Sequence, residues 1–175
     1  MIENYSRYRV LKEFFKNPTR NLQMREISRN TKISQPSIIQ HLKALIKEGL
    51  VIRTEEGLYP SYKANHENKK FKSYKKNDLL LDIENTGLAD YLDDKISLRV
   101  IVLFGSGARG EDTEDSDIDL YIEAPKTTIE ATKYEKLLRR KIELHFKERI
   151  SSYPKELRNN IANGIIIRGY LQIFK

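Results

Sequence analysis

The chain has 175 residues, no cysteine and a formal net charge of +7. This length accommodates one large domain or two small ones, and the lack of cysteine excludes disulfides, a thiolate nucleophile and a Cys-ligated zinc. The first residues lack the long apolar core of an export or membrane-insertion signal, so we expect a cytoplasmic protein with no membrane partner.

The charge is divided unevenly along the chain. Residues 1–77 carry 17 Lys and Arg against 7 Asp and Glu, a net charge of +10, whereas residues 78–175 carry 15 against 18, a net charge of −3. A basic half suggests a polyanionic partner, and an acidic half could hold metal ions between clustered carboxylates. Charge alone leaves open that both halves simply have solvated surfaces.

Three helices are predicted in the basic half. Apolar residues spaced by three and four predict helices over residues 5–16 and 22–30, followed by a third that starts after Ser34. Ser34 is the expected N-cap of this third helix, and Pro36 falls in its first turn, where a missing N–H costs nothing. Gly49 is expected to end the helix.

A β-hairpin is predicted next, because two short extended runs at residues 50–52 and 58–64 flank a polar turn that closes at Gly57. The polar, lysine-rich segment 67–77 then predicts a basic linker or an exposed helix. The first domain therefore spans residues 1–66.

The third helix has a polar outer face and follows a tight turn from another short helix, which is the layout of a helix-turn-helix recognition element. Polar side chains early on that face could reach base edges, and nearby cations could pair with phosphates. The expected base contacts are Ser37, Gln40 and His41, and the expected phosphate contacts are Lys43, Lys47, Arg53 and Lys63.

Residues 33–51, ISQPSIIQHLKALIKEGLV, resemble the recognition helix and first wing strand of winged helix transcriptional regulators of the ArsR and MarR type. The resemblance covers about residues 5–65. It implies a double-stranded DNA partner, a wing around Gly57 and a homodimer. A winged helix that binds another protein instead of DNA is the alternative.

The acidic half alternates strand and helix patterns, which predicts an α/β sheet. The expected elements are a helix over 78–94 that Gly87 interrupts, strands at 98–104, 118–122 and 142–146, a helix over 126–141, and a short helix after Pro154 followed by the apolar run 165–167. The overall fold class is therefore α+β, with the second domain at residues 78–175.

A glycine-rich segment follows the first of these strands. Gly105 and Gly107 let the backbone approach a ligand closely, so amide groups and the Ser106 hydroxyl could hold phosphate oxygens. Asp117 and Asp119 are two residues apart on a predicted strand, so their carboxylates leave the same face and could converge on a hard cation.

A nucleotide and two Mg²⁺ ions fit this pattern, since the metals would bridge a triphosphate and lower the pKa of an attacking hydroxyl. Glu143 on the next strand is the best candidate for the third carboxylate, as metal ligand or proton acceptor. Arg109 could contact phosphate or pair with a local acid. His145 could line the site, although a structural histidine is the more common case.

Gly105-Ser106, ten intervening residues and Asp117-x-Asp119 resemble the signature of the DNA polymerase beta nucleotidyltransferase superfamily, and especially its minimal nucleotidyltransferase branch, which includes antitoxins paired with helical toxins. The similarity covers about residues 80–170. It implies a mixed sheet flanked by helices and Mg²⁺-dependent transfer of a nucleoside monophosphate from a nucleoside triphosphate. The family usually has aspartate where this chain has Glu143.

Two functions follow as hypotheses. One is a DNA-binding transcriptional regulator whose nucleotidyltransferase-type domain binds Mg-NTP and transfers a nucleotide, or binds it without turnover. The other is an enzyme or antitoxin that transfers AMP to a partner such as a toxin and uses the winged helix for recognition. In both, Asp117, Asp119 and Glu143 would be the catalytic and metal-binding residues, and Gly105, Ser106 and Arg109 would bind the nucleotide.

Overall fold

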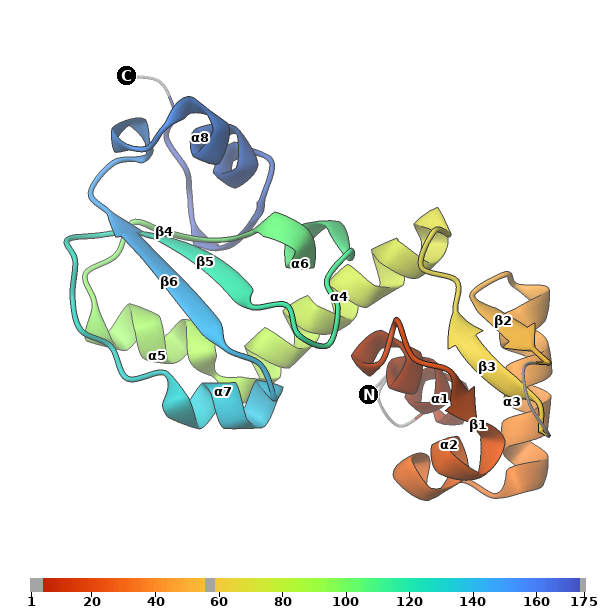
Figure 1. The fold of residues 1–175 in the computed structure, drawn as a ribbon. Coiled ribbons are helices and arrows are strands. Elements are labelled where there is room, and N and C mark those ends of the chain that lie inside the picture. The colour runs from red at the N-terminus through yellow and green to blue at the C-terminus, as the bar shows by residue number, and fades with distance from the viewer. Residues whose placement is uncertain (1–4, 56–58, 174–175) are drawn as a thin grey trace. The chain divides into compact units, whose positions relative to one another are not determined.

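The structure is a computed structural model that describes residues 5–55 and 59–173. The chain divides into two compact units, Met1–Asp78 and Leu79–Lys175, and each is described by itself (Figure 1). Gly57, where the sequence predicted the hairpin turn, lies outside the described residues. None of the described helices combines the length and apolar composition needed to cross a lipid bilayer.

The described part of the N-terminal unit is a winged helix, as predicted. Its elements are α1 (Ser6–Lys16), β1 (Leu22–Gln23), α2 (Met24–Thr31), α3 (Gln35–Lys47), β2 (Val51–Thr54) and β3 (Ser61–Ala64). The strands form an antiparallel sheet in the order β1-β3-β2. The hairpin β2–β3 thus follows helix α3 directly, which is the order expected for a recognition helix and wing.

One helix boundary differs from the sequence prediction. The helix expected over residues 22–30 starts only at Met24, because Leu22 and Gln23 form strand β1 and pair with Tyr62 and Ser61 of β3. Leu22 is buried. Its strand conformation depends on a partner about forty residues away, which helical periodicity cannot reveal.

Helix α3 has the expected ends. Ser34 occupies the N-cap position with an extended backbone, although its hydroxyl donates to Ser37 Oγ at 3.0 Å instead of capping a backbone amide. Gly49 adopts a left-handed φ of +71°, and the amides of Gly49 and Leu50 donate to carbonyls of the last helical turn. A glycine at this position avoids the Cβ clash of the left-handed conformation.

The core of this unit joins all three helices to the sheet. Its fully buried large side chains are Phe14, Leu22, Ile27, Ile38, Leu42, Leu45, Leu50 and Phe71. Phe15 and Phe71 meet edge to face with ring centroids 5.2 Å apart. Each such side chain contributes about 1.5–3 kcal/mol through its removal from water.

Phe71 belongs to the segment 67–77, for which the sequence predicted a linker or exposed helix. Most of this segment is the first part of helix α4 (Lys69–Thr86). The side-chain oxygen of Asn68 accepts the amides of Lys70 and Phe71 at 2.8 and 3.2 Å and so caps the helix. The segment is therefore ordered by its cap and by the burial of Phe71.

The C-terminal unit contains a four-stranded mixed sheet, as predicted. After α4 its elements are α5 (Leu88–Lys95), β4 (Val100–Phe104), α6 (Gly105–Arg109), β5 (Ile118–Glu123), α7 (Thr132–Leu138), β6 (Ile142–Lys147), the 3₁₀ helix η2 (Ile150–Ser152), α8 (Lys155–Ala162) and β7 (Ile165–Gly169). The strand order is β6-β5-β4-β7, with β5 and β6 parallel and the other pairs antiparallel.

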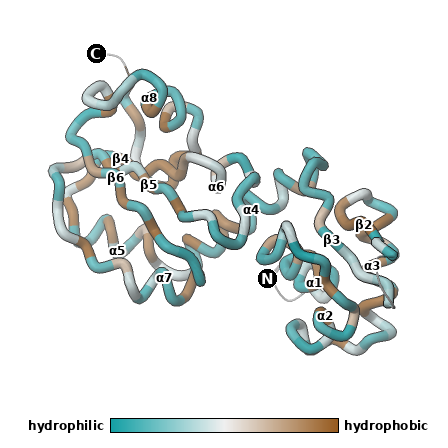
Figure 2. The backbone as a smooth tube through the Cα atoms, in the orientation of Figure 1, coloured by the Kyte–Doolittle hydropathy of each residue, from teal (hydrophilic) through white to brown (hydrophobic). Residues whose placement is uncertain are grey.

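Both faces of the sheet are covered by helices, which fits the apolar stretches on its central strands (Figure 2). One face packs against α4, α5 and α7 through Leu79, Ile83, Leu88, Leu92, Ile101, Leu103, Leu120, Ile122 and Tyr134. The opposite face packs on η2 and α8 through Val100, Val102, Phe104, Tyr121, Ile150 and Ile161. The two cores leave the β5–β6 end of this second face available for polar side chains.

The helix predicted over residues 126–141 is much shorter in the structure. It comprises only α7, because Thr127, Thr128 and Ile129 are β-branched and the Thr127 hydroxyl donates to the backbone carbonyl of Pro125 at 3.2 Å. Arg139, with a left-handed φ of +54°, ends the helix. The chain then enters β6.

Candidate functional site

Asp119 lies at the centre of the polar cluster on β5. Parallel pairing places it opposite Glu143 of β6, and antiparallel pairing places it opposite Phe104 at the end of β4. His145 is two residues after Glu143, so both side chains leave the same face of β6. The sheet register therefore brings an aspartate, a glutamate and a histidine together.

The distances in this cluster are those of potential metal ligands. The Nε2 atom of His145 lies 3.3 Å from Asp119 Oδ1 and 3.4 Å from Glu143 Oε2. One potential ligand atom from each of the three residues lies within 4.8 Å of the other two. Two carboxylates and an imidazole supply oxygen and nitrogen donors with a combined charge suited to a divalent cation.

Gly105 closes this cluster from the side of β4. It adopts a φ of +72°, and a Cβ atom at this position would lie 2.6 Å from Asp119 Oδ2. Only a glycine leaves the Asp119 carboxylate in place, because a side chain here would displace it. Ser106, the next residue, is half-buried in α6, so the glycine-serine element and Asp119 lie in one region.

Asp117 does not join the same group of ligand atoms. It is half-buried and immediately precedes β5, whereas the described side chains within 4.8 Å of one another are Asp119, Glu143 and His145. The sequence had grouped Asp117 with Asp119 and Glu143 because residues two apart on a strand share a face. Asp117 lies in the loop before the strand, where that rule does not fix the side chain.

Arg140 holds this loop. Its Nε donates to the carbonyl of Ser116 at 2.8 Å, Nη2 donates to the carbonyl of Asp117 at 3.0 Å, and Nη1 pairs with Asp112 Oδ2 at 2.7 Å. The five-donor fork of a guanidinium suits such a multiple contact. Sequence reasoning missed Arg140, since nothing local distinguishes it from the adjacent Arg139.

Arg109 pairs with a local acid, which was one of its two expected roles. Its Nε lies 2.7 Å from Glu111 Oε2, and both side chains are substantially exposed. Exposed ion pairs contribute little free energy.

His145 had two expected roles, a structural histidine or a side chain that lines the site, and both remain predictions: its Nε2 atom lies 3.3 Å from Asp119 Oδ1. Its ring also meets Phe104 edge to face with centroids 5.0 Å apart. The alternation of His145 with Glu143 on a predicted strand was the sequence signal that favours a place for His145 in the site.

The expected DNA contacts of helix α3 divide into two groups. Gln40, Lys43 and Lys47 are exposed and fall at three- and four-residue steps on one face. Ser37 and His41 are half-buried on the flank, and burial, followed by the charge of Arg7, lowers the pKa of His41.

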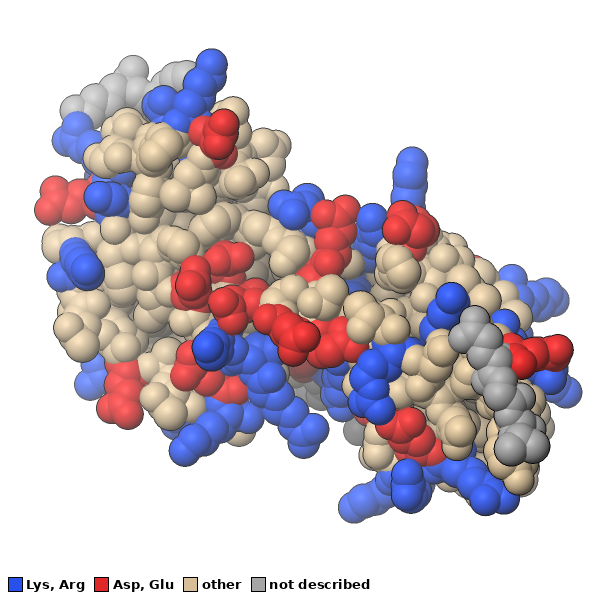
Figure 3. Space-filling view, in the orientation of Figure 1, with Lys and Arg blue, Asp and Glu red and all other residues tan. Residues whose placement is uncertain are grey.

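The wing also separates its two cations. In the β2–β3 register, Arg53 pairs with Tyr62 and Lys63 pairs with Ile52, so Arg53 and Lys63 lie on opposite faces of the sheet. The prediction that each of them contacts a phosphate remains, but the two contacts would lie on different faces of the wing. Figure 3 shows basic side chains spread around the N-terminal unit, and acidic side chains gathered on part of the C-terminal unit.

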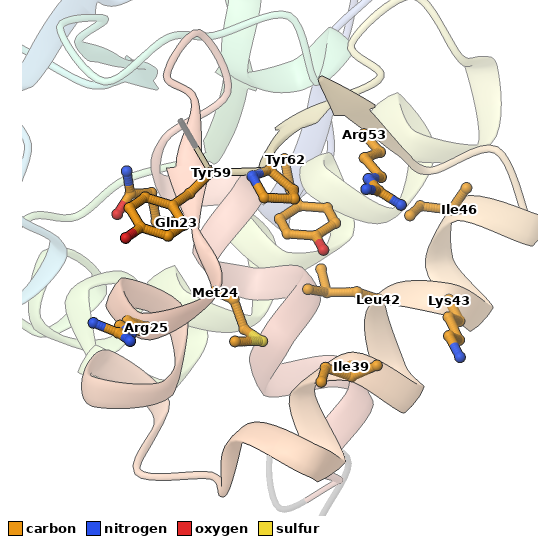
Figure 4. Close-up of a pocket in the computed structure, with 11 residues that line it drawn as sticks. Gln23, Met24, Arg25, Ile39, Leu42, Lys43, Ile46, Arg53, Tyr59 and Tyr62 are labelled. Atoms are coloured by element: carbon orange, nitrogen blue, oxygen red, sulfur yellow. The ribbon is translucent and has the colours of Figure 1, made fainter. Parts of the chain in front are cut away.

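Arg53 lies beside a groove of about 380 Å³ between α3 and the wing (Figure 4). The groove is lined on the α3 side by Ile39, Lys43 and Ile46, and on the strand side by Tyr62. Ile39 is 40% exposed. Sequence reasoning considered only the polar residues of this face and so missed Ile39. Ile39 lies four residues before Lys43, and this spacing places both side chains on the same face of α3.

Comparisons with known proteins found a matching family model for each unit. Residues 86–168 match the family model described as a nucleotidyltransferase domain, and residues 6–53 match the arsR family of bacterial regulatory proteins. The chain is also 42% identical over 67 residues to "Putative protein adenylyltransferase MJ1379" of Methanocaldococcus jannaschii, a match covering 34% of this chain and 67% of that protein. No solved structure matches the chain.

Proposed function

Because the chain belongs to the nucleotidyltransferase family and carries an arsR-type regulatory domain, we propose that it is a DNA-binding transcriptional regulator that also handles nucleotides. Its C-terminal unit binds a magnesium nucleoside triphosphate and transfers the nucleoside monophosphate to a protein or small-molecule acceptor. The observation that carries this proposal is the position of Asp119 between Gly105 and Glu143.

The residues at this position have complementary roles. Asp119 and Glu143, with Asp117 from the preceding loop, would hold Mg²⁺, which would neutralise phosphate charge and lower the pKa of the attacking hydroxyl. The amides near Gly105 and the Ser106 hydroxyl hold phosphate oxygens. Arg109 leaves Glu111 to pair with the nucleotide.

The transfer is a displacement at the α-phosphorus. The acceptor oxygen forms a bond to this phosphorus while the bond to the bridging oxygen of pyrophosphate breaks, and pyrophosphate leaves. The acceptor loses its proton to a carboxylate, and Glu143, with a side chain 57% exposed, is accessible to an incoming acceptor.

The DNA-binding part of the proposal is supported by charge and by helix α3. The first 77 residues have a net charge of +10, and α3 exposes Gln40, Lys43 and Lys47 on one face. A homodimer would place two such helices on a symmetric operator. Fluorescence anisotropy with genomic fragments tests this part, and an absence of binding even at low salt would refute it.

Transfer is tested with α-labelled nucleoside triphosphates, Mg²⁺ and the full chain. Asp119→Asn is expected to abolish nucleotide binding or labelling. Asp115→Asn is the matched control, because Asp115 is an exposed acid of the same loop region. Equal binding and labelling in the wild type and Asp119→Asn would show that the cluster is not a nucleotidyl-transfer site.

A second candidate is an antitoxin-type enzyme that transfers AMP to a partner protein such as a toxin. The name of the M. jannaschii relative, "Putative protein adenylyltransferase MJ1379", favours it. Labelled ATP incubated with the chain and the product of the neighbouring gene distinguishes the two. Label on that product favours the antitoxin, whereas DNA binding without protein labelling favours the regulator.

A further inference from the structure

We propose that His145 is a direct ligand of the metal and that the site therefore also binds a first-row transition ion such as Mn²⁺, more tightly than the Mg²⁺ of the proposed function. This inference rests on the proposed function, because it concerns the metal of the same site. It assigns a role to an imidazole that the three-carboxylate scheme does not use.

The register of the sheet carries the first step. Asp119 is opposite Glu143. Two residues further along the same parallel strands, Tyr121 is opposite His145. The two β6 side chains leave the same face, and Asp119 faces them from β5. One potential ligand atom from each of the three residues lies within 4.8 Å of the other two, so one ion can contact all three.

The second step concerns the orientation of the imidazole. The ring lies against buried Phe104, at an interplanar angle of 67° and a centroid distance of 5.0 Å. Its Nε2 atom is directed at the carboxylates of Asp119 and Glu143, at 3.3 and 3.4 Å. The donor atom therefore already points to the centre of the cluster, which reduces the entropy lost when a ligand is immobilised.

Ligand chemistry gives the selectivity. Mg²⁺ prefers oxygen ligands in octahedral geometry and retains its waters, whereas imidazole nitrogen suits transition ions. A site made only of carboxylates would bind mainly Mg²⁺, because metal availability helps to decide which ion such a site holds. Replacing one oxygen donor with Nε2 of His145 raises the affinity for first-row transition ions relative to Mg²⁺, with the smallest gain for Mn²⁺ and larger gains for the later ions of the row.

The test uses the full chain and Mn²⁺ as the probe. Pulsed electron paramagnetic resonance of bound Mn²⁺ detects a directly coordinated nitrogen through its ¹⁴N modulation. We expect this modulation in the wild type and its loss in His145→Gln. His66→Gln is the matched control, because His66 lies in the N-terminal unit with a 62% exposed side chain, and it should retain the modulation.

Competition between Mn²⁺ and Mg²⁺ gives a second readout. His145→Gln should lower the Mn²⁺:Mg²⁺ affinity ratio, because it removes the nitrogen donor that distinguishes the two ions. Circular dichroism identifies a variant that fails to fold, and in that case His145→Asn replaces it. Bound Mn²⁺ without ¹⁴N modulation in the wild type, or an unchanged ratio in the folded variant, would overturn the inference.

These outcomes separate the inference from the proposed function. If nucleotide labelling depends on Asp119 while the metal shows no nitrogen ligand, His145 is not a ligand and the transferase remains. If neither ion binds the wild-type chain with or without nucleotide, both proposals fail.

Discussion

The Nη1 atom of Arg140 lies 2.7 Å from Asp112 Oδ2, and both side chains are largely buried. The same guanidinium donates to the carbonyls of Ser116 and Asp117. One side chain from the turn after α7 thus fixes the loop that leads into β5. Any ligand held by Asp117 or Asp119 depends on this loop.

Arg140→Gln should destabilise the protein and weaken nucleotide binding. The substitution removes the guanidinium that pairs with the buried Asp112 carboxylate at 2.7 Å, and breaking a buried ion pair costs about 3–5 kcal/mol. Urea unfolding measures the first effect and nucleotide titration the second. Arg139→Gln, a change at the exposed neighbouring residue, should alter neither. Equal stability of the two variants would contradict the role given to Arg140.

Gly105→Ala should abolish metal binding, whereas Gly87→Ala should not. Both glycines have left-handed φ values, +72° and +74°, so each substitution costs about 1–2 kcal/mol of stability. A Cβ at Gly105 additionally meets the Asp119 carboxylate, while nothing lies within 4 Å at Gly87. Calorimetric titration with Mg²⁺ or Mn²⁺ compares the two. Unchanged affinity in Gly105→Ala would place the ion elsewhere.

Lys43→Ala should weaken DNA binding similarly for all sequences and reduce the salt dependence. One lost phosphate contact lowers the magnitude of the log–log slope by about 0.9. Anisotropy titrations over a range of salt concentrations measure it. Lys126→Ala removes an exposed charge from the C-terminal unit and serves as the control. A slope equal to that of the wild type would remove Lys43 from the interface.

His41→Gln should reduce the loss of stability in mild acid. Burial and the charge of Arg7 lower the pKa of His41 in the folded state, so the unfolded chain takes up a proton more readily. Stability contributed by neutral His41 is present above the unfolded pKa of about 6.5 and decreases as the pH falls through it toward the folded value. Thermal unfolding between pH 7.5 and 5 tests this, with His66→Gln as the control. Parallel pH profiles for wild type and His41→Gln would argue against it.

Local patterns were sufficient for most elements of the fold. The apolar spacing around Ile38 and Leu42, with Pro36 and Gly49 at the ends, predicts α3 because these signals act within one helix. The Gly105-Ser106 and Asp117-x-Asp119 spacing likewise identifies the nucleotidyltransferase unit. One failure was at a segment whose conformation depends on a distant partner, since Leu22 becomes a strand by pairing with Tyr62. The other, the overlong helix over residues 126–141, overlooked a local signal, the β-branched residues 127–129.

The sequence by itself determined the order of the two units, the charge difference between them and the motif that ends at Asp119, because each is a property of neighbouring residues. Only the tertiary structure decided which side chains meet there. Parallel pairing places Glu143 and His145 beside Asp119, and Arg140 reaches back to the loop before β5. These contacts join residues more than twenty positions apart, so strand register and helix packing fix them and local spacing does not.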